Sequence, residues 1–243
     1  MKKRTLGFNL VLLVALLLLS GCIFSGADPA PPDTIEMVDV SPDDWFYPYI
    51  VAGLRFGLIE GESGGYFEPD RNVTVAEFVT MLGRLHEYGN DTIGTPGEGE
   101  PYERYLNWAA ELELDITRVR RRNQGVEYIE YVQYIDLALP NESITREQMA
   151  VMVSRYISTF ELWDYFRHGF AMGMISFGDF DTSDWALGTI ELLRTSLLVY
   201  SEPGENRFRP RDYATRAEVV EILVKVCSAV YDLRHPMQPC PYQ

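Results

Sequence analysis

The sequence has few basic residues, few cysteines and few histidines for its length. It contains 21 Lys and Arg against 36 Asp and Glu, with three Cys and three His in 243 residues. Nucleic-acid binding requires a surface rich in Lys and Arg, so this charge balance excludes a nucleic-acid module. Three cysteines cannot form a disulfide scaffold, and no pair of them has the spacing of zinc ligands. Hydrophobic residues at 47% and aromatic residues at 13% are enough for a packed core.

Motifs for catalysis or metal binding are also missing. The sequence has no Gly-rich phosphate loop, no nucleophile elbow, and no pair of carboxylates whose spacing favours acid–base catalysis. The acidic cluster Asp179, Asp181 and Asp184 lacks the glutamate that a calcium loop places twelfth, where Ile190 stands. We therefore expect a protein that is not an enzyme and that holds neither cofactor nor metal.

The first 22 residues predict an export signal. Three basic residues at positions 2–4 precede an unbroken apolar run, Leu10 to Leu19, which is too short to span about 30 Å of hydrocarbon. The run ends in Leu-Ser-Gly-Cys and resembles the processing site of bacterial lipoproteins, in which the cysteine, here Cys22, is lipidated. We expect a signal peptide at 1–21 and a lipidated cysteine with a flexible, Pro-rich linker at 22–35. Two acyl chains on Cys22 would anchor the protein stably to a membrane.

An internal repeat organises the rest of the chain. Two blocks share four landmarks at nearly the same spacing: Asp39, Trp45, Pro69 and Thr74 in the first, and Asp179, Trp185, Pro210 and Thr215 in the last. A looser middle block has Pro101 at the Trp position and an excess of about fifteen residues, which we place near 117–131. This excess carries a basic run, Arg118, Arg120, Arg121 and Arg122. The repeats are predicted at 36–90, 98–160 and 170–232, with a tail at 233–243.

Each block ends in the same helix signal. A Thr-x-x-Glu or Thr-x-x-Gln tetrad, beginning at Thr74, Thr145 or Thr215, predicts a capping box. Apolar residues then recur every three or four positions, as on one face of a helix. The predicted stripes are Phe78, Met81, Leu82 and Leu85; Met149, Met152, Val153 and Tyr156; and Val219, Ile222, Leu223 and Val226. Three such stripes predict a core of three helices.

The repeated Asp, Trp, aromatic-x-Pro and Thr-Arg-Ala-Glu resemble the S-layer homology (SLH) domain over residues 36–232. The resemblance implies an all-α fold, in which three SLH repeats form a pseudo-threefold helical spindle around a central three-helix bundle. It also implies non-covalent binding of a secondary cell-wall polysaccharide, often a pyruvylated glycan, in grooves between the repeats.

Two arginines are the main candidates for glycan binding. Arg146 and Arg216 follow their capping Thr, where the helix dipole disfavours a cation, so we expect each to have an anionic partner. That partner is either a glycan carboxylate, held by the guanidinium and by free helix N–H groups, or an acid of a neighbouring repeat such as Asp39 or Asp179. The resemblance favours the glycan. Val75 stands where the first repeat would have this arginine, so the groove of the first repeat lacks that cation.

Other candidate site residues lie where each repeat begins and at a turn. Trp45 with Asp44, and Trp185 with Asp184, offer a ring to stack on a sugar and a carboxylate to accept hydroxyl hydrogen bonds, although core packing explains the tryptophans more simply. Gly61 either lets the backbone approach a ligand or serves a turn that needs positive φ.

Cys227 and Cys240 either form a disulfide that fixes the tail, or Cys227 is a buried thiol. The sequence thus predicts a lipid-anchored protein that binds cell-wall polymer outside the cytoplasm. The alternative is a degenerate SLH fold that binds another envelope protein, whose identity the sequence does not indicate.

Overall fold

A computed structural model describes residues 37–61, 63–89, 92–93, 99–166, 182–196, 198–199 and 207–234. All of them belong to one unit, Glu36–Gln243. The predicted signal peptide, Cys22, the linker, Asp179 and Cys240 lie outside the described residues. Within the described ranges, no helix combines the length and apolar character needed to cross a membrane.

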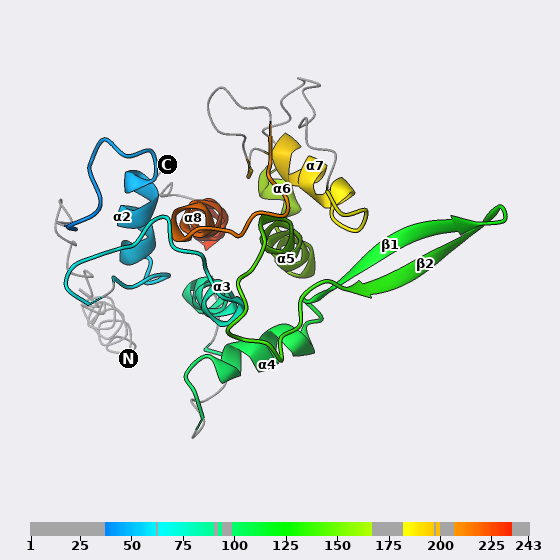
Figure 1. Cartoon of the computed structure of the whole chain (residues 1–243), viewed down its shortest axis with the longest axis horizontal. Helices are drawn as coiled ribbons and strands as arrows, with labels where there is room; N and C mark the ends of the chain where they lie inside the picture. The colour runs from blue at the N-terminus through cyan, green and yellow to red at the C-terminus, as the bar shows by residue number, and fades with distance from the viewer. Residues whose placement is uncertain are drawn as a thin grey trace, which may run out of the picture. The chain divides into compact units, whose positions relative to one another are not determined.

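Three long helices form the centre of the fold: α3 (Val75–Gly89), α5 (Arg146–Thr159) and α8 (Arg216–Arg234) (Figure 1). All twelve residues of the predicted apolar stripes are buried, which confirms those faces. Burying a large apolar side chain stabilises a fold by roughly 1.5–3 kcal/mol, so these stripes are a main source of stability.

The capping boxes are also confirmed. In each tetrad the Thr hydroxyl accepts the third N–H of the helix, and the Glu or Gln side chain accepts the N–H of the Thr.

A short helix opens each block: α2 (Tyr47–Arg55), α4 (Glu103–Glu111) and α7 (Leu187–Thr195). Each has nine residues and begins two positions after Trp45, Pro101 or Trp185, which supports the alignment made from the sequence. The same hydrogen bond follows the end of each helix. The N–H of a leucine (Leu58, Leu114 or Leu198) donates to the carbonyl of the residue five positions earlier. In Figure 1, α2 lies beside α8, α4 beside α3 and α7 beside α5. Each opening helix therefore packs on the long helix of another block.

The three chain segments before the long helices bond in a ring. The N–H of Val73 donates to the carbonyl of Ala214, that of Ala214 to Ile144, and that of Ile144 to Val73, at 2.9–3.0 Å. The pattern continues in the first turns of the helices. The first two N–H groups of α3 donate to the middle block, those of α5 to the last block and those of α8 to the first block. The same set of bonds between blocks thus occurs three times.

The inserted residues of the middle block form a β-hairpin. Strands β1 (Ile116–Asn123) and β2 (Val126–Gln133) pair antiparallel with no offset, Ile116 opposite Gln133 and Asn123 opposite Val126. The hairpin includes residues 117–131, where the sequence predicts the insertion. The all-α expectation holds for the helices but is wrong for these residues. A short helix, α6 (Trp163–Phe166), follows α5.

Candidate functional site

Arg146 is buried between two blocks and forms an ion pair with Glu218 of α8. Its Nε donates to the carbonyl of Phe208 at 2.7 Å, and its guanidinium lies 4.8 Å from the centre of the Phe208 ring. Glu218 also pairs with Arg209 at 2.9 Å. Arg146 thus has an anionic partner within the protein, Glu218 of the last block, whereas Asp39 bonds elsewhere and Asp179 lies outside the described residues.

Arg216 occupies the corresponding place at the start of α8. Its Nε donates to the carbonyl of Phe67 at 2.8 Å, and its guanidinium lies 4.8 Å from the Phe67 ring centre. A second guanidinium nitrogen donates to the carbonyl of Glu60 at 3.1 Å. Asp39 has another role, because its carboxylate accepts the N–H groups of Phe67 and Glu68 and so fixes the aromatic-x-Pro segment.

The helix N–H groups beside these arginines are already bonded. The N–H groups of Arg146 and Glu147 donate to Asp212 and Pro210, and the N–H of Arg216 donates to Arg71. The expectation that free amides would help to hold a ligand carboxylate is therefore wrong. The bonds between blocks use those donors.

The corresponding interface of the middle block has no such charges. Val75 replaces the arginine, Ala138 replaces the phenylalanine of the aromatic-x-Pro segment, and Gln148 replaces the glutamate of the capping box. Gln148 instead donates from its amide to the carbonyl of Tyr134 at 2.8 Å. These three substitutions relative to the other blocks are far apart in the sequence, but in the structure they belong to one interface, which is neutral.

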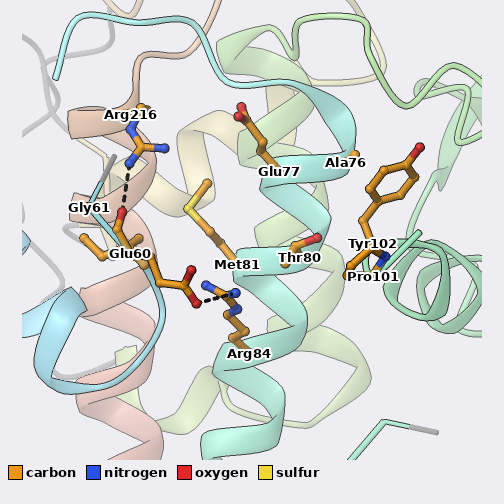
Figure 2. Close-up of a pocket in the computed structure, with 11 residues that line it drawn as sticks. Glu60, Gly61, Ala76, Glu77, Thr80, Met81, Arg84, Pro101, Tyr102 and Arg216 are labelled. Carbon is orange, nitrogen blue, oxygen red and sulfur yellow. Dashed lines mark hydrogen bonds and ion pairs between the residues drawn. The ribbon is translucent and has the colours of Figure 1, made fainter. Parts of the chain in front are cut away.

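A groove of about 330 Å³ lies where Arg216 meets α3 and the start of α4 (Figure 2). Its walls include Gly61, Arg84, Tyr102 and Arg216. The carboxylate of Glu60, which is largely exposed, pairs with Arg84 at 2.8 Å, while the carbonyl of Glu60 accepts from Arg216. At the open groove, the cation Arg84 is therefore already paired with a carboxylate of the protein, that of Glu60.

Gly61 lies in this groove, six residues beyond the end of α2. The helix ends at Arg55 and is followed by Gly57, which has φ of +67°, so Gly61 does not end it. Gly61 itself lacks a positive φ, and a Cβ there would make only ordinary contacts, at 3.6 Å or more. Neither the turn nor the packing therefore requires a glycine at this position.

The two candidate tryptophans have different surroundings. Trp45 is 56% exposed and contacts Phe46 edge to face, so core packing does not explain it. Its neighbour Asp44 accepts the N–H of Ser41 at 2.7 Å and shapes the turn before α2. Trp185 is half-buried and stacks on Tyr134 with 5.3 Å between ring centres.

Asp184 pairs with Arg121 of the hairpin. This guanidinium holds the pKa of the Asp184 carboxyl below its ordinary value. Asp184 and Trp185 also line a second cavity of about 400 Å³ with Arg118 and Arg120 of β1. The structure therefore brings Gly61 and Arg216 together in one groove and places Asp184 and Trp185 at another.

Cys227 is fully buried on α8. Because Cys240 lies outside the described residues, the predicted disulfide stays a prediction. Among the described residues, no group of acidic, His or Cys side chains could hold a metal ion.

The sequence alone did not identify Arg84, Tyr102 or the ion-pairing role of Glu218. Arg84 and Tyr102 belong to different blocks, and only the packing of α4 on α3 brings them together. A signal for Glu218 was present, since the arginine and the capping glutamate are lost at the same interface.

Residues 37–79 and 176–220 match the model of the S-layer homology domain. Both matches end within the first turns of a long helix, α3 or α8. SLH domains anchor proteins at the cell surface, and this is the role that the matches support.

Known relatives share this region. The chain is 28% identical to an amylopullulanase of Thermoanaerobacterium thermosulfurigenes over 74% of its own length and 9% of that protein. It is 27% identical to exoglucanase XynX (74% of this chain, 15% of the relative) and to cell surface glycoprotein 1 (77% and 8%), both of Acetivibrio thermocellus. The chain thus spans a small fraction of each relative, and the enzyme names describe those longer proteins.

Proposed function

We propose that residues 98–160 form a third, divergent SLH repeat, so that three repeats make a pseudo-threefold spindle. The support is the nine-residue opening helix α4, the capping box at Thr145 and the cyclic bonds between blocks. The middle repeat differs in its neutral interface and in its hairpin.

We further propose that the protein binds an acidic secondary cell-wall polymer, such as a pyruvylated glycan, without catalysing a reaction. The carrying observation is that Arg216 and Gly61 meet in one open groove with Arg84. Arg84 is about one-third exposed, and its acidic partner Glu60 is largely exposed, so a glycan carboxylate can replace that partner at little cost. Gly61 gives such a ligand access to the backbone.

The sequence of residues 1–22 supports a membrane tether through Cys22. A lipid anchor at one end and a wall-binding spindle at the other would make the protein a link between membrane and wall. The linker at 22–35 would span the distance between the membrane and the folded part of the chain.

Sedimentation with purified wall sacculi tests the proposed groove. The full chain, in non-ionic detergent, should sediment with intact sacculi and not with sacculi stripped of secondary polymer. Arg84→Gln and Gly61→Leu should each weaken binding by about tenfold or more, because one removes the exposed cation and the other fills the groove. Neither change touches the buried Arg146–Glu218 pair, so both variants should fold.

Ser63→Leu is the matched control, since it adds the same side chain at an exposed position two residues away. No binding of the unsubstituted chain to intact sacculi would refute the proposed function. Binding that survives Arg84→Gln and Gly61→Leu would show that the polymer does not use this groove.

A further inference from the structure

The hairpin is the largest feature that the spindle does not require. Its two-residue loop, Gln124 and Gly125, has φ of +49° and +84°, as in the tight turns that favour hairpins. Thr117 and Val119 are buried at its base, while most of the remaining hairpin residues are exposed. Figure 1 shows β1 and β2 extending away from the long helices.

One face of the hairpin combines cations with apolar groups. Directly paired residues of a sheet share a face, so Arg118 lies beside Tyr131 and Arg120 beside Ile129. The Arg118 guanidinium lies 5.7 Å from the centre of the Tyr131 ring. Tyr131 is 63% exposed and Ile129 is 51% exposed. We call these four residues the Arg–Tyr face.

The two arginines of this face differ in pairing from the other two of the basic run. Arg121 pairs with Glu130 and Asp184, and Arg122 pairs with Glu127 at 2.8 Å. Within the part of the chain that the structure describes, neither Arg118 nor Arg120 pairs with a carboxylate. Acidic residues outnumber basic ones in this chain, 36 to 21, so two open guanidiniums side by side are unusual.

We propose that the Arg–Tyr face binds a second segment of an acidic polysaccharide. This rests on the proposed function, because the ligand is the same class of wall polymer. Planar guanidiniums bind carboxylate or phosphate groups through paired hydrogen bonds. The exposed Tyr131 ring offers a flat surface on which a sugar packs.

The shape of the face favours a polymer chain over a folded protein. A stable protein interface buries about 800 Å² on each partner around an apolar centre. The Arg–Tyr face has two apolar side chains in a narrow strip, which suits an extended ligand. A polymer held at the groove and at the hairpin would bind more tightly than through either contact alone.

The test compares binding to sacculi and to three defined polymers: polygalacturonate, poly(glycerol phosphate) and neutral dextran. Arg118→Ala with Arg120→Ala in the full chain should weaken binding to sacculi about tenfold, and Tyr131→Ala about threefold. The first two polymers distinguish carboxylate from phosphate recognition, and dextran should not bind. Arg207→Ala with Arg211→Ala removes the same charge from an exposed segment and should change binding by less than about twofold.

The outcomes separate this inference from the proposed function. If Gly61→Leu abolishes binding to sacculi while Arg118→Ala with Arg120→Ala leaves it unchanged, the Arg–Tyr face is not a glycan site and the groove stands. If the arginine variant alters only the sedimentation coefficient of the free protein, the face joins copies of the chain and the inference is refuted. If the unsubstituted chain does not bind sacculi, both proposals fail.

Discussion

At the residue scale, the two carboxylate oxygens of Glu218 have separate roles. Oε2 accepts the N–H of Thr215 in the capping box, at 3.0 Å, and Oε1 pairs with Arg146 and Arg209. The Glu218 side chain therefore caps the start of α8 and also links the last block to the middle block. Breaking a buried ion pair by removing one partner typically costs about 3–5 kcal/mol, since a charge is left without compensation.

The neutral interface of the middle block shows how this pair can be replaced. Arg146→Val should lower the free energy of unfolding by about 3–5 kcal/mol. Glu218→Gln also destabilises, but the double variant should lose less than the sum, because Val75 and Gln148 form a stable neutral equivalent. Urea unfolding of the four proteins measures the coupling. Arg122→Ala, at an exposed pair, should cost less than about 1 kcal/mol. Additive effects would show that Arg146 and Glu218 act independently.

The sequence could show that Arg146 needs an anion but could not say which one. Glu218 already had a role in the capping box, and its second role depends on a contact between blocks. The groove was predicted only in part for the same reason. Gly61 and Arg216 stood out by type and position, whereas Arg84 is an ordinary helix residue until α4 packs beside it.

At the element scale, the helices were more predictable than the hairpin. Capping boxes and stripes are local signals, and they predicted α3, α5 and α8 from short windows of sequence. The hairpin signal was weaker, because buried Thr117 and Val119 alternate with Arg118 and Arg120 only until Arg121 and Arg122 break the pattern. The turn at Gly125 was the remaining indication. Length alone located the insertion.

Asp115 lies between α4 and β1, at the base of the hairpin. Its carbonyl accepts the N–H of Tyr134 and its carboxylate accepts from the Gln133 amide, both at 3.1 Å. Burial raises the pKa of the Asp115 carboxyl above its ordinary value of 3.8. The folded state thus binds this proton more strongly than the unfolded state, and the contribution of Asp115 to stability falls as the pH rises from 3.8 through the folded pKa.

Asp115→Asn should therefore stabilise the protein at pH 7, because the amide keeps the hydrogen bond without a buried charge. The advantage should shrink as the pH falls and disappear below about pH 3.8, where Asp115 is protonated in both states. Urea unfolding at pH 7, 5 and 3.5 measures it. An advantage that is the same at all three values would contradict this assignment.

At the scale of the whole molecule, two charged interfaces and one neutral interface join the three blocks. The neutral interface belongs to the block that carries the hairpin, and the open groove lies at a charged one. The repeated motifs predict the helices that all three blocks share, and the interfaces differ where the sequence departs from the repeat. The sequence shows the departures, and the structure shows which of them belong together.

The ring of bonds among Val73, Ile144 and Ala214 should make unfolding cooperative. Ala214→Pro removes the N–H that bonds to Ile144, and we expect a loss of about 3 kcal/mol or more in a single transition. Ala214→Gly keeps this N–H and should cost about 1 kcal/mol. Circular dichroism and tryptophan fluorescence should give one midpoint. Two separate transitions would show that the blocks unfold independently.

The same ring of bonds limits the order in which the chain can fold while it is synthesised. The N–H groups of Val75 and Ala76 bond to carbonyls at Glu142 and Pro140, and those of Arg146 and Glu147 bond to Asp212 and Pro210. When the first block is made, the carbonyls that accept the first two N–H groups of α3 do not yet exist. The bonds between the three blocks can therefore form together only after the last block has been made.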